Sequence, residues 1–92
     1  MLGINYPKLE YKEDIFGAIK KVAYVARALS GLIHTGEWFD KEGDRIIMMS
    51  LWESEELAFN ASQTLRPLIT QYPWTEWERK PGESFLGLKQ VV

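Results

Sequence analysis

The chain has 92 residues, a net charge of −2 and a hydrophobic fraction of 46%. This length predicts a single domain spanning residues 1–92. The charge balance argues against a nucleic acid partner, which would select a basic stripe. No apolar run approaches the roughly 20 residues of a membrane span, the start does not have the pattern of a signal peptide, and the lack of cysteine excludes disulfides and thiolate metal sites. We therefore expect a cytoplasmic domain without a nucleic acid or membrane partner.

The first third of the chain predicts a short strand followed by a helix. Apolar residues alternate with smaller or polar ones over residues 2–6, and Pro7 limits any strand there to an edge or a short piece. Over residues 14–29, apolar side chains recur at steps of four and three, which is one helical stripe. The stripe consists of Ile15, Ile19, Val22, Ala26 and Leu29. Gly31 accepts the left-handed conformation just past a helix end, so we expect the helix to stop there.

A β-hairpin is predicted next. Its strands are Leu32–Phe39 and Arg45–Trp52, around a polar turn in which Gly43 is expected to need a positive φ. The second strand is apolar on both faces. One face carries Ile47, Met49 and Leu51, and the other carries Ile46, Met48 and Trp52, interrupted only by Ser50. A strand that is apolar on both faces is covered on both faces.

The last part of the chain predicts a second helix and a closing strand. Ser54 is placed to cap the helix, with acidic residues in its first turn. Its buried stripe is expected to be Leu57, Ala58, Ala61 and Leu65. Pro67 disfavours the α conformation at the preceding residue, so the helix ends or kinks at Arg66, with one further turn as an alternative. Residues 75–79 form either an edge strand or an extended loop, and Ser84–Val92 is the predicted closing strand.

The expected order is β, α, β, β, α, β, which is the ferredoxin-like α+β arrangement with both helices on one face of an antiparallel sheet. The other face would still carry apolar side chains, and such a patch is larger than monomers usually expose. A two-fold dimer in which two sheets face each other covers it most simply. Alternatively, the C-terminal segment folds back over that face within one chain. We expect a homodimer.

Three segments carry a resemblance to a known family. They are Gly31-Leu32-Ile33, the strand ending in Trp38, and the strand-to-helix junction Met49-Ser50-Leu51-Trp52-Glu53-Ser54-Glu55-Glu56-Leu57-Ala58. They resemble the antibiotic-biosynthesis monooxygenase-like branch of the dimeric α+β barrel superfamily. The resemblance implies a dimeric barrel that oxygenates quinol-like aromatics without flavin or metal, degrades heme, or has no assigned reaction. The second predicted helix lacks the tryptophan and histidine of the heme-degrading members, which argues against heme.

The candidate chemistry lies on the hairpin. His34 is the only histidine, and a histidine can act as a base near neutral pH. In one hairpin register its face is shared by Trp38, Ser50 and Trp52. Together with Met48, these side chains would hold a small aromatic or apolar ligand from which His34 takes a proton. The plainer interpretations are a histidine hydrogen-bonded to Ser50 or to backbone, and tryptophans that belong to the core.

Two functions from different classes follow from these residues. One is a monooxygenase-like enzyme without cofactor that acts on a small aromatic molecule in a half-barrel pocket. The other is a non-catalytic dimeric barrel for ligand binding or assembly. Trp74 and Trp77 are predicted at an interface or pocket rim, and Glu37 and Asp40 are predicted to be solvated. No metal-ligand cluster or phosphate loop is visible in the sequence, so we expect no metal.

Overall fold

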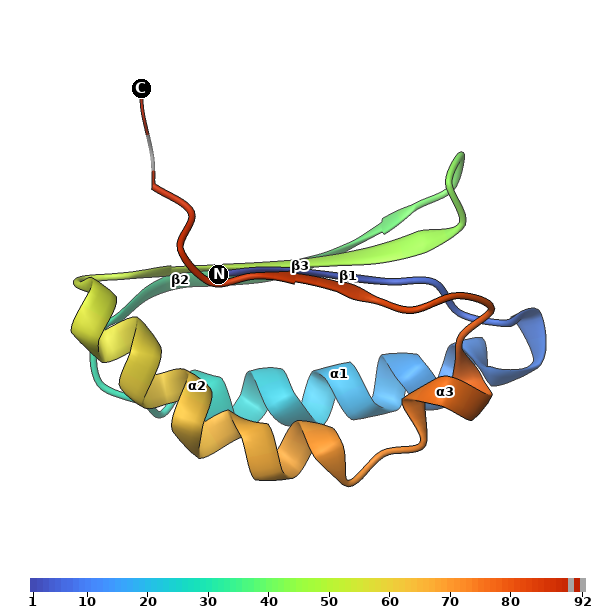
Figure 1. The fold of residues 1–92 in the computed structure, drawn as a ribbon, viewed down its shortest axis with the longest axis horizontal. Helices are drawn as coiled ribbons and strands as arrows, with labels where there is room; N and C mark the ends of the chain where they lie inside the picture. The colour runs from blue at the N-terminus through green and yellow to red at the C-terminus, as the bar shows by residue number, and fades with distance from the viewer. Residues whose placement is uncertain (90, 92) are drawn as a thin grey trace.

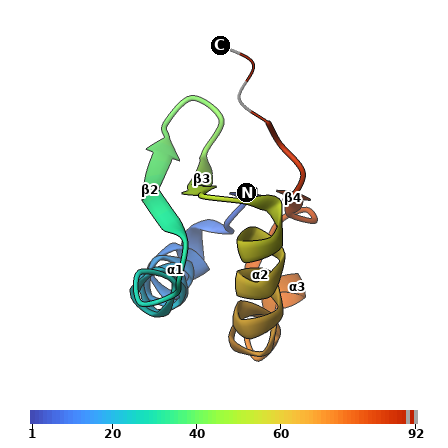
Figure 2. The same ribbon diagram turned by 90° about the vertical axis from the view of Figure 1, so that its left-hand side faces the viewer.

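An antiparallel sheet and a layer of helices make up the fold in a computed structural model, which describes residues 1–89 and 91 (Figure 1). Among these residues the sheet has four strands in the order β2–β3–β1–β4. The strands are β1 (Leu2–Asn5), β2 (Leu32–Asp40), β3 (Arg45–Trp52) and β4 (Glu83–Phe85). The helices are η1 (Leu9–Tyr11), α1 (Lys12–Ala26), α2 (Glu55–Thr70) and α3 (Trp74–Trp77). Both long helices lie against one face of the sheet (Figure 2), so the predicted ferredoxin-like α+β fold is confirmed.

Helix α1 buries the stripe that its periodicity predicts. Ile15, Ile19, Val22 and Ala26 are each at most 6% exposed. The helix ends at Ala26, before Leu29, because its last turn tightens: the next two N–H groups after Arg27 bond to carbonyl oxygens three residues back. Gly31 follows with a φ of 88°, which confirms the predicted stop.

Two groups of buried side chains hold the layers together. One joins α1 to β3 and contains Ile15, Ile19 and Ile46. The other joins α1 to α2 and contains Val22, Ala26 and Leu65. Ile46 is only 1% exposed and Met48 packs against the same group. The even-numbered residues of β3 therefore face the helices, and the odd-numbered residues face away.

Helix α2 begins as predicted and continues past its proline. The Ser54 Oγ accepts a hydrogen bond from the Leu57 N–H at 3.1 Å, which confirms the cap. The helix does not end at Arg66 but runs through Pro67 to Thr70, which confirms the alternative of one further turn. Leu68 packs against the group between α1 and α2, and this burial stabilises the turn beyond the proline.

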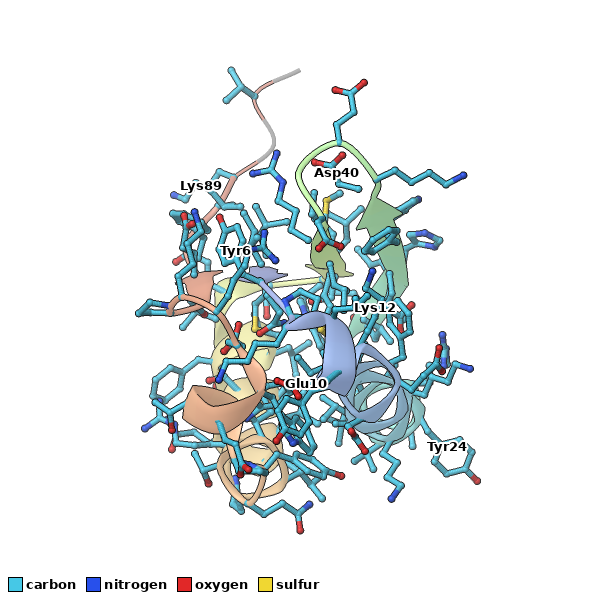
Figure 3. All side chains as sticks on the ribbon, turned by 90° about the vertical axis from the view of Figure 1, so that its right-hand side faces the viewer. Tyr6, Glu10, Lys12, Tyr24, Asp40 and Lys89 are labelled. Carbon is cyan, nitrogen blue, oxygen red and sulfur yellow. The ribbon has the colours of Figure 1, made fainter. Side chains whose placement is uncertain are left out.

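The hairpin turn is closed by charged side chains. Asp40 Oδ2 accepts a hydrogen bond from Arg45 Nε at 2.9 Å, and this bond holds the pKa of Asp40 below its usual value. The positive φ of the turn, 46°, lies at Asp44, so the expectation that Gly43 adopts it is wrong. Asp44 tolerates this conformation as aspartate often does, and Lys12 Nζ lies 3.0 Å from its carboxylate. Figure 3 shows Asp40 on the hairpin and Lys12 on α1 below it.

The segment that follows α2 differs from the prediction. Residues 74–77 form the short helix α3, neither an edge strand nor an extended loop. The rings of Tyr72, Trp74 and Trp77 lie 5.6–5.8 Å from one another, and both tryptophans pack against the Ile15–Ile19–Ile46 group. Trp74 and Trp77 are therefore half-buried and pack against the core, and their place at an interface or pocket rim stays a prediction.

The closing strand is shorter than expected. Among the described residues of this segment, only Glu83–Phe85 pairs with β1. The described residues after Phe85 leave the sheet as an exposed tail (Figure 1). Gln90 and Val92, which the predicted strand included, lie outside the described residues. The described tail does not cover the face of the sheet opposite the helices, where Trp38 is 49% exposed, Met49 42% and Leu51 43%.

Backbone hydrogen bonds join residues 77–79 to the segment just after β1, and the single carboxylate among them, that of Glu78, is partly buried. Glu78 Oε2 accepts a hydrogen bond from the Tyr6 N–H at 3.0 Å. Burial raises the pKa of Glu78, and the hydrogen bond from Tyr6 only partly offsets that shift. A carboxyl with a raised folded-state pKa favours folding when protonated. Its contribution is therefore lost as pH rises from the ordinary glutamate pKa through the raised value.

Glu78→Gln should raise the melting temperature at about pH 7 and leave it nearly unchanged at about pH 4, where the native carboxyl is mostly protonated. Glutamine keeps an acceptor oxygen for the Tyr6 N–H and carries no charge to desolvate. Thermal unfolding followed by circular dichroism at both pH values measures the effect. Glu53→Gln, at an exposed position, is the matched control. An equal change at both pH values would contradict the prediction.

Candidate functional site

The pairing of β2 with β3 decides which hairpin side chains share a face. His34 pairs with Leu51, Gly36 with Met49 and Trp38 with Ile47. Thr35 pairs with Ser50, Glu37 with Met48 and Phe39 with Ile46. Directly paired residues of an antiparallel sheet point to the same side, and Ile46 faces the helices. Thr35, Glu37 and Phe39 therefore face the helices, and His34, Gly36 and Trp38 lie on the opposite face, called the open face below.

The expectation that His34 shares a face with Ser50 and Trp52 is therefore wrong. In the observed register Asp40 pairs with Arg45 across the turn. A register shifted by one residue would be needed to bring His34, Ser50 and Trp52 to the same face. Ser50 Oγ accepts a hydrogen bond from Trp52 Nε1 at 2.8 Å, so its partner is that tryptophan and not His34. The predicted set is divided: His34 and Trp38 lie on the open face, and Met48, Ser50 and Trp52 lie on the helix side.

The open face is mostly apolar, although it also carries His34 of β2 and Glu83 of β4, which pairs with Ile4. From β1 it carries Leu2 and Ile4, from β3 Ile47, Met49 and Leu51, from β2 Trp38 and from β4 Phe85. Phe85 is 42% exposed, comparable with Met49 and Leu51. The Trp38 indole lies over Gly36, where a Cβ would come within 2.6 Å of the ring, so the strand presents a flat aromatic surface. Monomers rarely expose a continuous apolar patch of this kind.

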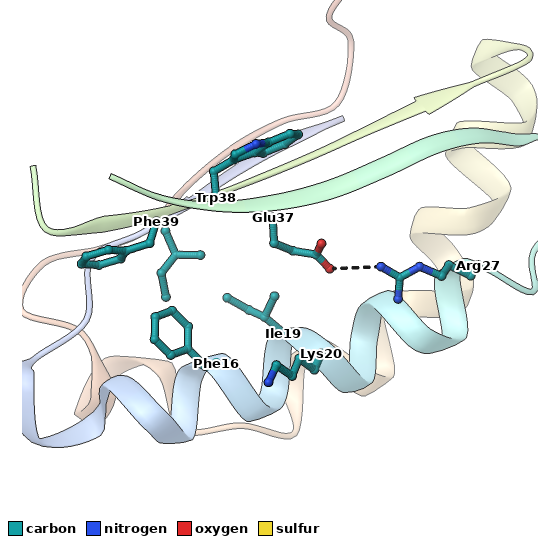
Figure 4. A pocket seen from close by; sticks show the side chains of 8 residues that line it. Phe16, Ile19, Lys20, Arg27, Glu37, Trp38 and Phe39 are labelled. Carbon is teal, nitrogen blue, oxygen red and sulfur yellow. Dashed lines mark ion pairs between the residues drawn. The ribbon is translucent and has the colours of Figure 1, made fainter. Parts of the chain in front are cut away.

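A cleft of about 420 Å³ lies on the other side of β2, between this strand and α1. Its lining residues are Phe16, Ile19 and Lys20 of α1, Arg27 just past the end of α1, Glu37, Trp38 and Phe39 of β2, and Ile46 of β3. Figure 4 shows the Glu37 side chain directed toward α1 and the Trp38 indole on the far side of β2. The rings of Phe16 and Phe39 meet edge to face with centroids 6.0 Å apart. The cleft is therefore apolar at its base and aromatic at one end.

The opposite end of the cleft is charged. Glu37 Oε1 lies 3.9 Å from Arg27 Nη2, which is too long for a hydrogen bond (Figure 4). The Glu37 side chain is 25% exposed and that of Arg27 is 55% exposed. Glu37 was expected to be solvated, and this expectation is wrong. The missed signal is its place in the alternation: it lies two residues before Phe39, on the face that the helices cover.

A second, wider groove of about 950 Å³ lies where β3 leads into α2. It is lined by Met49, Leu51 and Trp52 of β3, by Ala58 and Phe59 of α2 and by residues 86–89 of the tail, among others. Of the predicted ligand-binding residues, Trp38 lines the α1–β2 cleft, Ser50 and Trp52 line this groove, and Met48 lines neither cavity. Its charged lining groups, Glu55 and Lys89, pair with each other at 3.2 Å.

The described residues contain no group of three or more histidine, cysteine, aspartate or glutamate side chains able to hold a metal ion. Within the same part of the chain, no helix is both long and apolar enough to span a membrane. The charged side chains that line the α1–β2 cleft are those of Glu37, Arg27 and Lys20.

No protein-family model matches the chain, and no curated protein matches it by sequence. Solved structures do match its fold. Rv0793 from Mycobacterium tuberculosis matches with a TM-score of 0.77 and 11% identity over 99% of this chain and 95% of that chain. A conserved protein from Methanosarcina mazei Go1 matches with a TM-score of 0.77 and 16% identity over 89% and 82%. A structure described as an antibiotic biosynthesis monooxygenase matches with a TM-score of 0.71 and 11% identity over 90% and 92%.

At these identities the likeness shows the fold. The chain has a ferredoxin-like α+β fold similar to that of the structure described as an antibiotic biosynthesis monooxygenase, in line with the resemblance of its segments. Its reaction and ligand have to be argued from its own cavities, because a fold of this type hosts many activities.

Proposed function

We propose that the cleft between α1 and β2 binds a small aromatic molecule. The observation that carries this proposal is the combination of about 420 Å³ of space with an apolar base, an edge-to-face pair of phenylalanines and a few polar groups at one end. Small-molecule sites generally have this composition, at volumes of about 300–1,000 Å³. A cavity of roughly 150 Å³ already holds one benzene ring, so two or three fused rings fit the cleft.

The enzymatic form of the proposal is a monooxygenase without flavin or metal; one matched structure is described as an antibiotic biosynthesis monooxygenase. A substrate with an acidic CH2 group beside an aromatic ring loses a proton to Glu37, which acts as general base. The carbanion then gives electrons to O2. One oxygen atom stays on the carbon as a carbonyl after the second hydrogen is lost, and the other oxygen atom leaves as water. Arg27, 3.9 Å from Glu37, is placed to stabilise negative charge on the substrate.

The same proposal includes a homodimer in a cytoplasmic setting, in which the open faces of two sheets meet. Burying a large apolar side chain contributes roughly 1.5–3 kcal/mol, and Trp38, Met49, Leu51 and Phe85 are all at least 42% exposed in one chain. In this dimer His34 and Trp38 lie inside the barrel. The prediction that His34 is the catalytic base therefore places the reaction in the barrel interior, whereas Glu37 places it in the α1–β2 cleft.

Oxygen consumption with anthrone as substrate and no added cofactor distinguishes these positions. A general base contributes about 100-fold or more to the rate, so Glu37→Gln should reduce the rate by at least that factor. His34→Ala should leave it within about twofold. The reverse pattern would place the reaction in the barrel interior and contradict the assignment to the cleft. Circular dichroism checks that both variants fold.

The second candidate function is a dimeric barrel that binds an aromatic ligand without a reaction. The short list of polar groups in the cleft favours it, since they number only Glu37, Arg27 and Lys20 among the lining residues described above. It predicts that 2-naphthol binds in the cleft while anthrone produces no oxygen consumption. Phe16→Ala should weaken 2-naphthol binding in either case, because the edge-to-face partner of Phe39 is lost.

A further inference from the structure

The two ends of the α1–β2 cleft, which lies along α1, differ in chemistry. Phe16 lies at one end against Phe39, and Arg27 lies at the other end against Glu37. Lys20 is one helical turn after Phe16, and it precedes Arg27 by about two turns, or about 10 Å. The lysine thus lines the cleft between its aromatic end and its ion pair. A ligand whose ring contacts Phe16 therefore has Lys20 within reach of a ring substituent.

The charges along this cleft do not balance. Arg27 and Glu37 face each other at 3.9 Å and offset one another. At the aromatic end, Lys12 lies 4.7 Å above the centre of the Phe39 ring, and its charge is matched by Asp44 at 3.0 Å. Among the described residues Lys20 has no carboxylate within 4 Å. One cation in the lining is therefore unmatched, beside an apolar surface that would hold a ring.

We infer that the ligand of this cleft is an aromatic anion, with its ring at Phe16 and a carboxylate or similar oxyanion at Lys20. This inference rests on the proposed function, because it names the chemical class of the aromatic molecule placed in the same cleft. The lysine ammonium group is carried by a flexible side chain, so it can reach an oxyanion at several positions around the bound ring. Glu37, beside Arg27 at the far end, repels an anion at that position and directs the oxyanion toward Lys20.

Two probes of nearly equal shape test this inference: 2-naphthoate, which carries a carboxylate, and 2-naphthamide, which is neutral. Calorimetry measures the equilibrium binding of both probes to the native chain, to the Lys20→Gln variant and to the Lys21→Gln variant. The two lysines are neighbours, both exposed on α1, and each substitution removes one positive charge. Only Lys20 lines the cleft, so the pair separates a local contact from the effect of net charge.

The native chain should bind 2-naphthoate about fivefold more tightly than 2-naphthamide, a modest preference because exposed ion pairs contribute little. Lys20→Gln should remove this preference, and Lys21→Gln should retain most of it. Equal binding of the two probes to the native chain would overturn the inference, and so would equal effects of the two substitutions. Neither result would contradict the proposal that the cleft binds an aromatic molecule. If neither probe binds, the proposed function fails and the inference fails with it.

Discussion

A Met49→Glu variant should run as a monomer under conditions in which the native chain runs as a homodimer. Met49 lies near the middle of the open face, paired with Leu2 on one side and Gly36 on the other, and is 42% exposed. A carboxylate there would be desolvated between two apolar sheets without a partner, which costs several kcal/mol for an ion. Light scattering on a sizing column measures the change as a halving of the mass.

The control for this variant is Tyr24→Glu, which adds the same charge to a side chain that is 79% exposed on α1 and points away from the sheet (Figure 3). It should leave the dimer intact. A native chain that elutes with the mass of one chain would contradict the proposed interface outright.

Gly31→Ala should lower the free energy of unfolding by at least the roughly 1–2 kcal/mol that a left-handed conformation costs a residue with a Cβ. The φ of Gly31 is 88°, and an added Cβ would lie 2.5 Å from Leu57 Cδ1 and 2.8 Å from Leu57 Cβ. Leu57 is in the first turn of α2, so relief of this contact would displace that helix from the junction. Urea unfolding measures the loss.

Gly17→Ala is the matched control for Gly31→Ala. Gly17 lies within α1, and nothing is within 4 Å of an added Cβ there. Alanine is favoured over glycine in a helix interior by about 1 kcal/mol, so this variant should be more stable than the native chain. A loss at Gly17 equal to that at Gly31 would show that the left-handed conformation is not the cause.

Periodicity was sufficient to predict most of the fold. The step pattern of Ile15, Ile19, Val22 and Ala26 marks the buried stripe of α1, and Ser54 marks the start of α2. Each of these signals is local, because it depends on residues within a few positions along the chain. The extent of α2 past Pro67 and the helical form of residues 74–77 depend instead on contacts with α1 and the core, which the local pattern does not contain.

The candidate site was harder to predict because it depends on register. A shift of one residue in the pairing of two strands moves every side chain of one strand to the other face. The pairing of Asp40 with Arg45 places His34 on the open face and brings Glu37 to the helices. Glu37 was expected to be solvated because it is acidic and lies near a turn. The pairing instead places it in a cleft, where it faces Arg27.

The most direct test of the aromatic cleft is a titration of the isotopically labelled protein with 2-naphthol, followed by backbone and aromatic chemical shifts in NMR spectra. The proposed function predicts that the largest shifts are at Phe16, Glu37 and Phe39, with small shifts at Trp52 and Phe59 in the groove beside α2. Shifts centred on Trp52 and Phe59, or on the open face around Met49, would contradict it.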